Sequence, residues 1–289
     1  MILQAIRVFK QLQSNDFTLL VTIERWMRRY EFVPTDRLQA SNKLSPKDTL
    51  YSLGRLNKFK LVVRRAGGRV GYKLLPAGSD ALVLKSLVDN GMLEAFGTPL
   101  GIGKEADIYD ALAPDGTKVA VKFNRLGRTS FTRARSLRPY SLKHDWMYIS
   151  RRAASREFEA LQKLYPTVSV PRPIALDRHV VVMDLIDGVE LANVKKIPGA
   201  ENVLNEIIEN IKRTYQLGIV HADLSEHNIV IKPDGDVLII DWPQYLSVHQ
   251  ARAEEMLRRD IENVLKYFKR KFGVVRDASQ VLKYIIAGQ

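Results

Sequence analysis

The sequence has no cysteine among its 289 residues. Disulfides, thiolate zinc sites and cysteine nucleophiles are therefore excluded. The sequence also has no apolar run as long as a transmembrane helix, and its first residues lack the apolar core and cleavage site of a signal peptide. These absences predict a cytoplasmic protein without a membrane partner.

Acidic residues are scarce relative to basic ones, and the imbalance is uneven. The chain has 45 Lys and Arg against 32 Asp and Glu, a net charge of +13. Its first 75 residues contain fifteen basic and five acidic residues, a surplus of ten. Such asymmetry predicts a module that binds a polyanion, most simply a nucleic acid, although a merely solvated basic face would look the same.

Helical patterns occupy most of this basic region. Apolar spacing and start signals predict helices at about 2–12, 16–30, 35–40 and 45–58. The last of these has the clearest start, because Ser45 can cap it, Pro46 suits its first turn and Asp48 lies near the positive end of its dipole. Its buried face should consist of Leu50, Leu53 and Leu56.

A basic hairpin should follow these helices. Residues 61–65 and 69–74 flank Gly67-Gly68, a pattern typical of two strands joined by a tight turn. Helices followed by such a wing predict a winged helix-turn-helix domain over residues 1–76. The candidate nucleic-acid contacts are Lys47, Arg55, Lys58, Arg64, Arg65 and Arg69. RNA, DNA and protein all remain open as ligands, because this small fold also serves as a protein-docking module.

Residues 77–93 should form a helix that links this domain to a second one, with Ser79 as its cap. The second domain is expected to have an N-lobe at 94–186 and a C-lobe at 187–289. A long, arginine-rich insert at 124–145 is expected to be mobile and close to the active-site mouth. Its arginines (Arg125, Arg128, Arg133, Arg135 and Arg138) could meet phosphate or RNA, and its hydroxyls (Thr129, Ser130 and Thr132) could accept a phosphoryl group. A solvated, functionless insert is equally compatible with these residues.

The strongest chemical signal is the sequence from His221 to Asp241. His221-x-Asp223 with Asn228 five residues later, followed by an apolar strand that ends in Asp241, is typical of ATP-dependent phosphotransferases. In that chemistry Asp223 would orient the attacking hydroxyl, while Asn228 and Asp241 would hold a magnesium ion. The alternative is a polar turn between a helix and a hairpin.

Two upstream segments would supply ATP to this loop. A glycine-containing loop between two expected strands provides the candidate phosphate contacts Gly101, Gly103, Lys104, Glu105 and Ala106, with Ala106 where a third glycine is usual. The apolar strand at 119–123 carries a single lysine, Lys122, which would neutralise phosphates. A buried lysine needs a partner, for which we select Glu157 of the following helix, with Glu159 as the alternative.

The candidate adenine-binding hinge is the segment 180–188. Its backbone would pair with the edge of the base, and the candidate residues are Met183, Asp184 and Ile186. A simple buried strand would fit the same residues. After Asp241 the sequence continues Trp242-Pro243-Gln244 and then predicts two helices, at 251–272 and 278–286. It has no Ala-Pro-Glu and leaves no room for the large peptide-substrate subdomain of ordinary protein kinases.

These residues together resemble the RIO atypical protein kinases. The matching motifs are Gly-x-Gly-Lys-Glu-Ala (101–106), Val-Lys-Phe (121–123), Ser-Arg-Glu-Phe-x-Ala-Leu (155–161), His-x-Asp-Leu-Ser-x-x-Asn (221–228) and Ile-Asp-Trp-Pro-Gln (240–244). The N-terminal winged helix is similar to that of the second RIO subfamily. The resemblance implies an α+β fold, in which a winged helix precedes a compact bilobal kinase-like domain without an activation segment or a large substrate subdomain.

The resemblance also implies ATP and Mg²⁺ as ligands, with Mn²⁺ as an alternative metal. It places Gly101, Gly103 and Lys104 at the triphosphate and Asp223 as the catalytic aspartate. It further implies that Asp241 is both a metal ligand and a candidate phosphoaspartate in an ATPase cycle. The implied partners are the small ribosomal subunit precursor and its rRNA, whereas the protein phosphoacceptor is not indicated. Two departures are Ala106, where the family commonly has serine, and Trp242, where phenylalanine is usual.

Two other functions were weighed against this one. A winged-helix nucleic-acid-binding regulator with a kinase-like nucleotide sensor would have lost a catalytic residue, yet Lys122, Asp223, Asn228 and Asp241 are all present. A small-molecule phosphotransferase would have a large acidic substrate lobe after the catalytic loop. The short tail and the basic N-terminal region argue against it.

Overall fold

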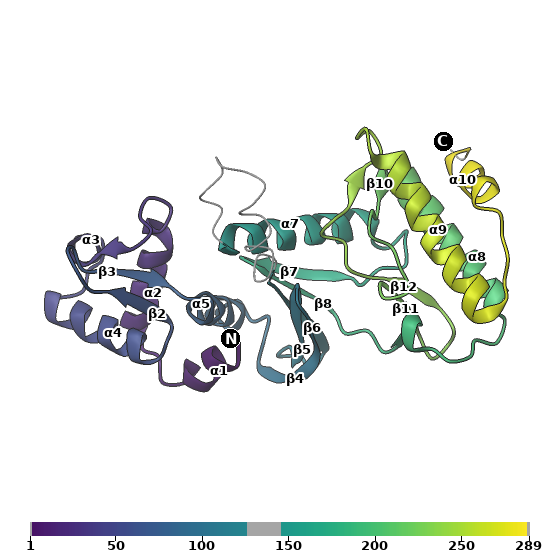
Figure 1. The fold of residues 1–289 in the computed structure, drawn as a ribbon. Helices are drawn as coiled ribbons and strands as arrows, with labels where there is room; N and C mark the ends of the chain where they lie inside the picture. The colour runs from purple at the N-terminus through teal and green to yellow at the C-terminus, as the bar shows by residue number, and fades with distance from the viewer. Residues whose placement is uncertain (1, 126–145, 288–289) are drawn as a thin grey trace. The chain divides into compact units, whose positions relative to one another are not determined.

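A computed structural model describes residues 2–125 and 146–287 (Figure 1). The chain divides into two compact units, Met1–Met92 and Leu93–Gln289. Most of the predicted insert, including all its candidate arginines except Arg125 and all its candidate hydroxyls, lies outside the described residues. Within the described ranges, no helix is both long and apolar enough to cross a membrane.

The first unit is a winged helix, as the sequence predicts. Its helices are α1 (Ile2–Phe9), α2 (Ser14–Trp26), α3 (Thr35–Ala40), α4 (Pro46–Lys58) and α5 (Pro76–Asp89). Its sheet has the order β1-β3-β2, formed by Val33–Pro34, Gly71–Leu74 and Val62–Arg65. The first two helices end three and four residues earlier than predicted. Val33 and Pro34, expected only to break a helix, form an edge strand paired with β3, where a proline is tolerated.

Helix α4 begins as predicted but packs through a different face. The Ser45 hydroxyl accepts a hydrogen bond from the Asp48 backbone N–H at 3.1 Å. Leu53 and Leu56 are buried, whereas Leu50 is 51% exposed, so the prediction for Leu50 is wrong. The small side chains of Thr49 and Ser52 occupy the buried face instead. Since α4 packs on α2, α3 and β2, small residues at these positions allow a close approach that a leucine would prevent.

Helix α5 lies within the first unit. It begins at Pro76, the first helical position, rather than after Ser79 as expected. It packs against α1 and α2, and both Ser79 and Asp80 are fully buried. The helix expected as a linker is thus part of the packed core of this unit.

The second unit starts with a five-stranded antiparallel sheet of order β4-β5-β6-β8-β7. The strands are β4 (Ala95–Ile102), β5 (Ala106–Leu112), β6 (Lys118–Asn124), β7 (Pro173–Asp177) and β8 (Val180–Asp184). Helix α7 (Trp146–Leu164) packs against β6, β7 and β8. This sheet and helix form the predicted N-lobe and bring Lys122 of β6 to face α7.

The remaining chain forms a helical lobe. Its helices are α8 (Ala200–Gln216), α9 (Ala253–Phe272), α10 (Ala278–Ile286) and the short 3₁₀ helix η1 (Leu191–Asn193). Helices α8 and α9 lie side by side (Figure 1). Two small sheets complete the lobe: β9 (Val189–Glu190), β11 (Ile229–Ile231) and β12 (Val237–Ile239), and β10 (Ile219–Val220) with β13 (Leu246–Ser247). Over the described residues after Asp241 the chain forms only β13, α9 and α10, so neither an activation segment nor a large substrate subdomain is present in this range.

Candidate active site

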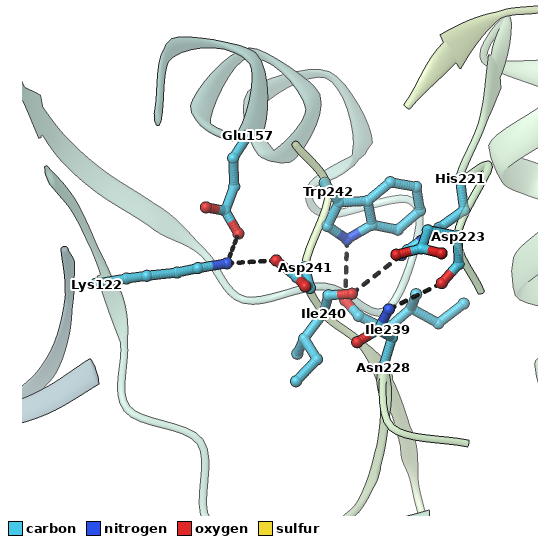
Figure 2. A network of polar contacts seen from close by, with 9 residues as sticks. All are labelled: Lys122, Glu157, His221, Asp223, Asn228, Ile239, Ile240, Asp241 and Trp242. Carbon is cyan, nitrogen blue, oxygen red and sulfur yellow. Dashed lines mark hydrogen bonds and ion pairs between the residues drawn. The ribbon is translucent and has the colours of Figure 1, made fainter. Parts of the chain in front are cut away.

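Lys122 lies at the centre of the candidate site (Figure 2). Its ammonium group is 2.5 Å from Glu157 Oε1 of α7 and 2.6 Å from Asp241 Oδ1. Lys122 is 5% exposed and Glu157 is 1% exposed, whereas the alternative partner Glu159 is on the exposed face of α7. Strand β6 and helix α7 therefore direct a cation and an anion from opposite sides to the start of the segment after β12.

Charge pairing fixes the protonation states of this group. Burial lowers the pKa of Lys122, but the charges of Glu157 and Asp241 outweigh it and raise the pKa above its usual value. Burial alone would raise the pKa of Asp241, but the Lys122 charge and hydrogen bond leave it lowered. The site thus presents a permanent cation beside an ionised carboxylate, as a phosphate- and metal-binding centre requires.

The backbone at both acidic residues is strained. Ala222, just before Asp223, has φ 65°, and Asp241 has φ 69°. A non-glycine residue in this left-handed region costs on the order of 1–3 kcal/mol, so neighbouring contacts must hold it there. At Asp241 the holding contacts come from Trp242, which is buried and donates from Nε1 to the Ile239 carbonyl at 3.1 Å.

His221 provides the second of these contacts. Its Nε2 lies 3.0 Å from the Ile240 carbonyl, and its ring packs at 4.4 Å from the centroid of Trp242. Nδ1 is buried without a hydrogen-bond partner, so the proton must be on Nε2, which donates. Burial lowers the pKa of His221 to about 4. The histidine therefore acts as a neutral support beneath the strained Asp241 rather than as an acid or base.

This burial predicts a specific acid sensitivity. Between the ordinary histidine pKa of 6.5 and the folded value of about 4, the unfolded chain binds a proton that the folded protein does not. The free energy of unfolding should therefore fall by roughly 1.4 kcal/mol per pH unit as the pH drops through this window. His221→Gln should remove this component of the slope in urea titrations at pH 4–7. His227→Gln, an exposed position in the same loop, should retain it, and identical slopes for both variants would contradict the assignment.

Asp260 of α9 is a site residue that sequence reasoning missed. Its carboxylate accepts the backbone N–H groups of Ala222 at 2.7 Å and Leu224 at 3.0 Å, on either side of Asp223. The neighbouring Arg259 donates to the Ala222 carbonyl. Burial raises the pKa of Asp260 to about 7 despite these bonds. No signal in the sequence marked this residue, because an acidic residue within a charged helix looks like surface.

The remaining two loop residues lie where oxygen ligands are needed. The Asn228 amide nitrogen donates to the Asp223 carbonyl at 2.9 Å, which leaves its oxygen available as an acceptor. Burial, followed by the Asp241 charge, raises the pKa of Asp223, the change expected for a carboxylate beside another. Asn228 and Asp241 together offer neutral and anionic oxygen atoms, the donor types that suit Mg²⁺. The residues present therefore fit this metal.

The glycine-containing loop turns tightly between β4 and β5. The Gly103 N–H donates to the Ala106 carbonyl at 2.8 Å, and a Cβ at Gly101 would meet nothing within 4 Å. Gly101, Gly103 and Lys104 are exposed, and Ala106 is half-buried. The pKa of Glu105 is raised by burial and by the charges of Asp241 and Asp223. This loop is thus open to a ligand and electrostatically coupled to the acidic centre.

Arg125, at the start of the predicted insert, is 1% exposed and donates to Asp107 at 3.0 Å. The expectation that it meets phosphate or RNA is therefore wrong, because its guanidinium is enclosed beneath the sheet. Its backbone N–H bonds the Glu105 carbonyl at 2.6 Å and so ties the end of β6 to the glycine-containing loop.

In the candidate hinge, Met183 is buried within the core and Asp184 pairs with Arg172 at 2.9 Å. The Asp184 N–H already bonds the Arg172 carbonyl, at 3.1 Å. A base edge would therefore have to meet the backbone beyond Asp184, at the half-buried Ile186.

The candidate nucleic-acid contacts divide into two groups. Lys47, Lys58 and Arg64 are exposed. The others are exposed or partly buried but engaged within the first unit: Arg65 stacks over Phe32, Arg69 pairs with Asp36, and Arg55 pairs with the buried Asp16. The first group is therefore better placed to meet an external ligand.

Comparisons with known proteins match both units. A family model of the RIO domain matches residues 107–281, and one of the Rio2 N-terminal domain matches residues 9–90. A RIO-type serine/threonine-protein kinase Rio2 from Methanocaldococcus jannaschii is 42% identical over 272 residues, covering 90% of this chain and 99% of that protein. The Dictyostelium discoideum serine/threonine-protein kinase rio2 is 33% identical, with 93% of this chain covering 52% of its length. The chain thus spans about half of this eukaryotic relative.

A solved structure is also similar over almost the whole chain. It is the Rio2 kinase from Chaetomium thermophilum, described as a complex with ADP, Mg²⁺ and phosphoaspartate. The similarity has a TM-score of 0.84 and 28% identity, and covers 96% of this chain and 88% of that one.

Proposed function

This chain belongs to the RIO family of protein kinases, and on that premise we propose that it is an ATP- and Mg²⁺-dependent serine/threonine phosphotransferase with ATPase activity. The observation that carries the proposal is the Lys122–Glu157–Asp241 group, in which a buried cation pairs with two carboxylates at 2.5 and 2.6 Å. A buried lysine between two acids is costly unless it serves a ligand. Phosphate oxygens are the ligands that such a cation neutralises.

Each residue then has a defined task. Lys122 neutralises charge on the ATP phosphates, and the glycine-containing loop covers them with exposed backbone. Asp223 accepts the proton of the attacking hydroxyl as its oxygen bonds the γ-phosphorus and the bond to the ADP oxygen breaks. The metal, bound by Asn228 and Asp241, supplies charge neutralisation to the leaving diphosphate. Mg²⁺ is the expected ion, and Mn²⁺ offers the same oxygen preference.

Asp241 is a candidate phosphoacceptor in its own right. Its side chain is 37% exposed, and one oxygen is held by Lys122 while the other remains for reaction. In this step a carboxylate oxygen bonds the γ-phosphorus, the bond to ADP breaks, and later attack of water releases phosphate. The phosphoaspartate named for the Chaetomium thermophilum kinase supports this proposal.

We further propose a cytoplasmic role in maturation of the small ribosomal subunit, in which the first unit binds rRNA. Its charge supports this role, since the first 75 residues have a surplus of ten basic residues. ATP turnover by the purified protein, measured with and without small-subunit precursor particles, tests it. The particles should change the turnover rate, whereas mature small subunits should have less effect. Indifference to both particles would contradict the ribosomal role but not the kinase assignment.

RNA affinity should depend steeply on salt. Each neutralised phosphate releases condensed counterions, so the logarithm of the affinity should fall by about 0.7–0.9 per phosphate for each tenfold rise in salt. Fluorescence anisotropy with labelled RNA at 50–300 mM KCl provides the slope. Reversing charge at the exposed Lys47, Lys58 and Arg64 should reduce it by about one unit per lost contact. An affinity that does not change with salt would exclude electrostatic RNA binding.

A further inference from the structure

We propose that the exposed face of α4 binds an unpaired base of single-stranded RNA, stacked on Tyr51 with the sugar–phosphate backbone lying against Gly54. Lys47 and Lys58 would meet the flanking phosphates. RNA binding by the first unit, as proposed above, is the premise, and the present step names the surface and the kind of RNA that it takes.

These four residues form one face by spacing. They follow one another at intervals of four, three and four residues, which places them in a single stripe along the helix. All four are exposed, and Tyr51 has 62% of its surface accessible. Leu50, at 51% exposure, lies beside Tyr51 and widens the apolar part. An exposed aromatic and an exposed leucine between two lysines form an amphipathic surface that solvent alone does not explain.

Gly54 is the least expected residue in this stripe. A glycine in a helix interior destabilises the helix by about 1 kcal/mol relative to alanine. Its φ is not positive, and a Cβ at this position would meet nothing within 4 Å. Neither backbone conformation nor packing within the described residues therefore requires glycine here. Close approach of a ligand backbone is the remaining physical reason for leaving the position bare.

Tyr51 is held in position from below. The Arg55 guanidinium lies 5.8 Å from the centroid of its ring. Arg55 is itself fixed, because it pairs with the fully buried Asp16 at 3.2 Å and donates to the Gln11 carbonyl at 2.5 Å. One face of the ring is thus supported by a cation, and the ring is oriented before any ligand arrives. This support explains why Arg55 is tied inward rather than presented to solvent.

The chemistry of this face favours a single strand. A base stacks on an aromatic side chain only if its own face is open, which paired bases inside a duplex do not offer. The positive charge continues onto the wing, where Arg64 is exposed and its backbone N–H bonds Asn57 of α4 at 3.2 Å. A phosphate chain crossing Gly54 would therefore have cations on both sides, whereas a protein partner would have to offer acidic residues there.

Full-length variants and a fluorescein-labelled twelve-nucleotide oligouridine provide the test. Tyr51→Ala should weaken binding by roughly 5- to 100-fold, the loss of about one stacked base, whereas Tyr51→Phe should stay close to wild type. Gly54→Leu should weaken binding at least tenfold while the melting temperature stays equal or rises, since leucine is the better helix former. Val21→Ala, at a 47% exposed position of α2, is the matched control and should change nothing.

Three results would overturn this assignment. If duplex RNA of the same length binds as tightly and Tyr51→Ala has no effect on either RNA, the inference fails while RNA binding itself stands. If Gly54→Leu binds like wild type, the close approach is excluded. If wild type binds no RNA, and Tyr51→Ala instead reduces binding to nuclease-treated precursor particles, α4 docks a protein and the proposed RNA role fails as well.

Discussion

Replacing Asp223 by alanine is expected to lower the rate of phosphoryl transfer by about 10²–10⁴-fold, the usual contribution of a positioned general base. The fold should persist, because Asp260 holds the backbone on both sides of Asp223 without using the Asp223 carboxylate. Transfer of label from γ-labelled ATP to the protein measures the rate, and thermal melting reports the fold.

A matched pair of variants sharpens this test. Asp223→Asn retains the shape of the side chain but cannot take a proton, so it should be about as slow as Asp223→Ala. Asp234→Ala, in the exposed turn between β11 and β12, should transfer at the wild-type rate. Turnover like wild type in purified Asp223→Ala would remove Asp223 from the mechanism.

Replacing Lys122 by methionine is expected to abolish ATP turnover and also to destabilise the protein. Glu157 would remain 1% exposed without its cation, and Asp241 would lose its partner. Breaking a buried ion pair by removing one partner costs about 3–5 kcal/mol, which should lower the melting temperature by roughly 6–20 °C. Calorimetry and ADP release measure the two effects.

The double variant Lys122→Met/Glu157→Leu separates stability from chemistry. Removing the orphaned carboxylate should recover much of the lost melting temperature, because an apolar pair can replace a buried ion pair. Activity should stay absent, since no cation remains for the phosphates. A Lys122→Met protein as stable as wild type would show that the Lys122–Glu157 pair is not a buried structural contact.

The motif residues could be placed from sequence because their chemistry fixes their order along the chain. Lys122, Asp223, Asn228 and Asp241 each sit at a strand or loop that the hydrophobic pattern already delimits. Glu157 and Glu159 could not be separated in this way, because both lie on α7 and only packing against β6 decides which is buried. The structure answers that question by burial, with Glu159 facing solvent.

Other features depend on long-range contacts and could not be foreseen. Asp260 supports the catalytic loop from 38 residues further along the chain. His221 was part of the motif, but its role as a neutral support for Ile240 requires the buried position beside Trp242. The buried face of α4 was misjudged because leucine at Leu50 outweighed Thr49 in a purely hydrophobic pattern. That exposed leucine now marks the face proposed to meet RNA.

The central claim is that this site performs chemistry on ATP rather than merely sensing it. The most direct measurement is ADP formation by the purified wild-type protein in a single turnover, with Mg²⁺ and again with the metal chelated. Metal-dependent conversion of bound ATP to ADP is the expected result. Tight ATP binding with no ADP formed under either condition would contradict it.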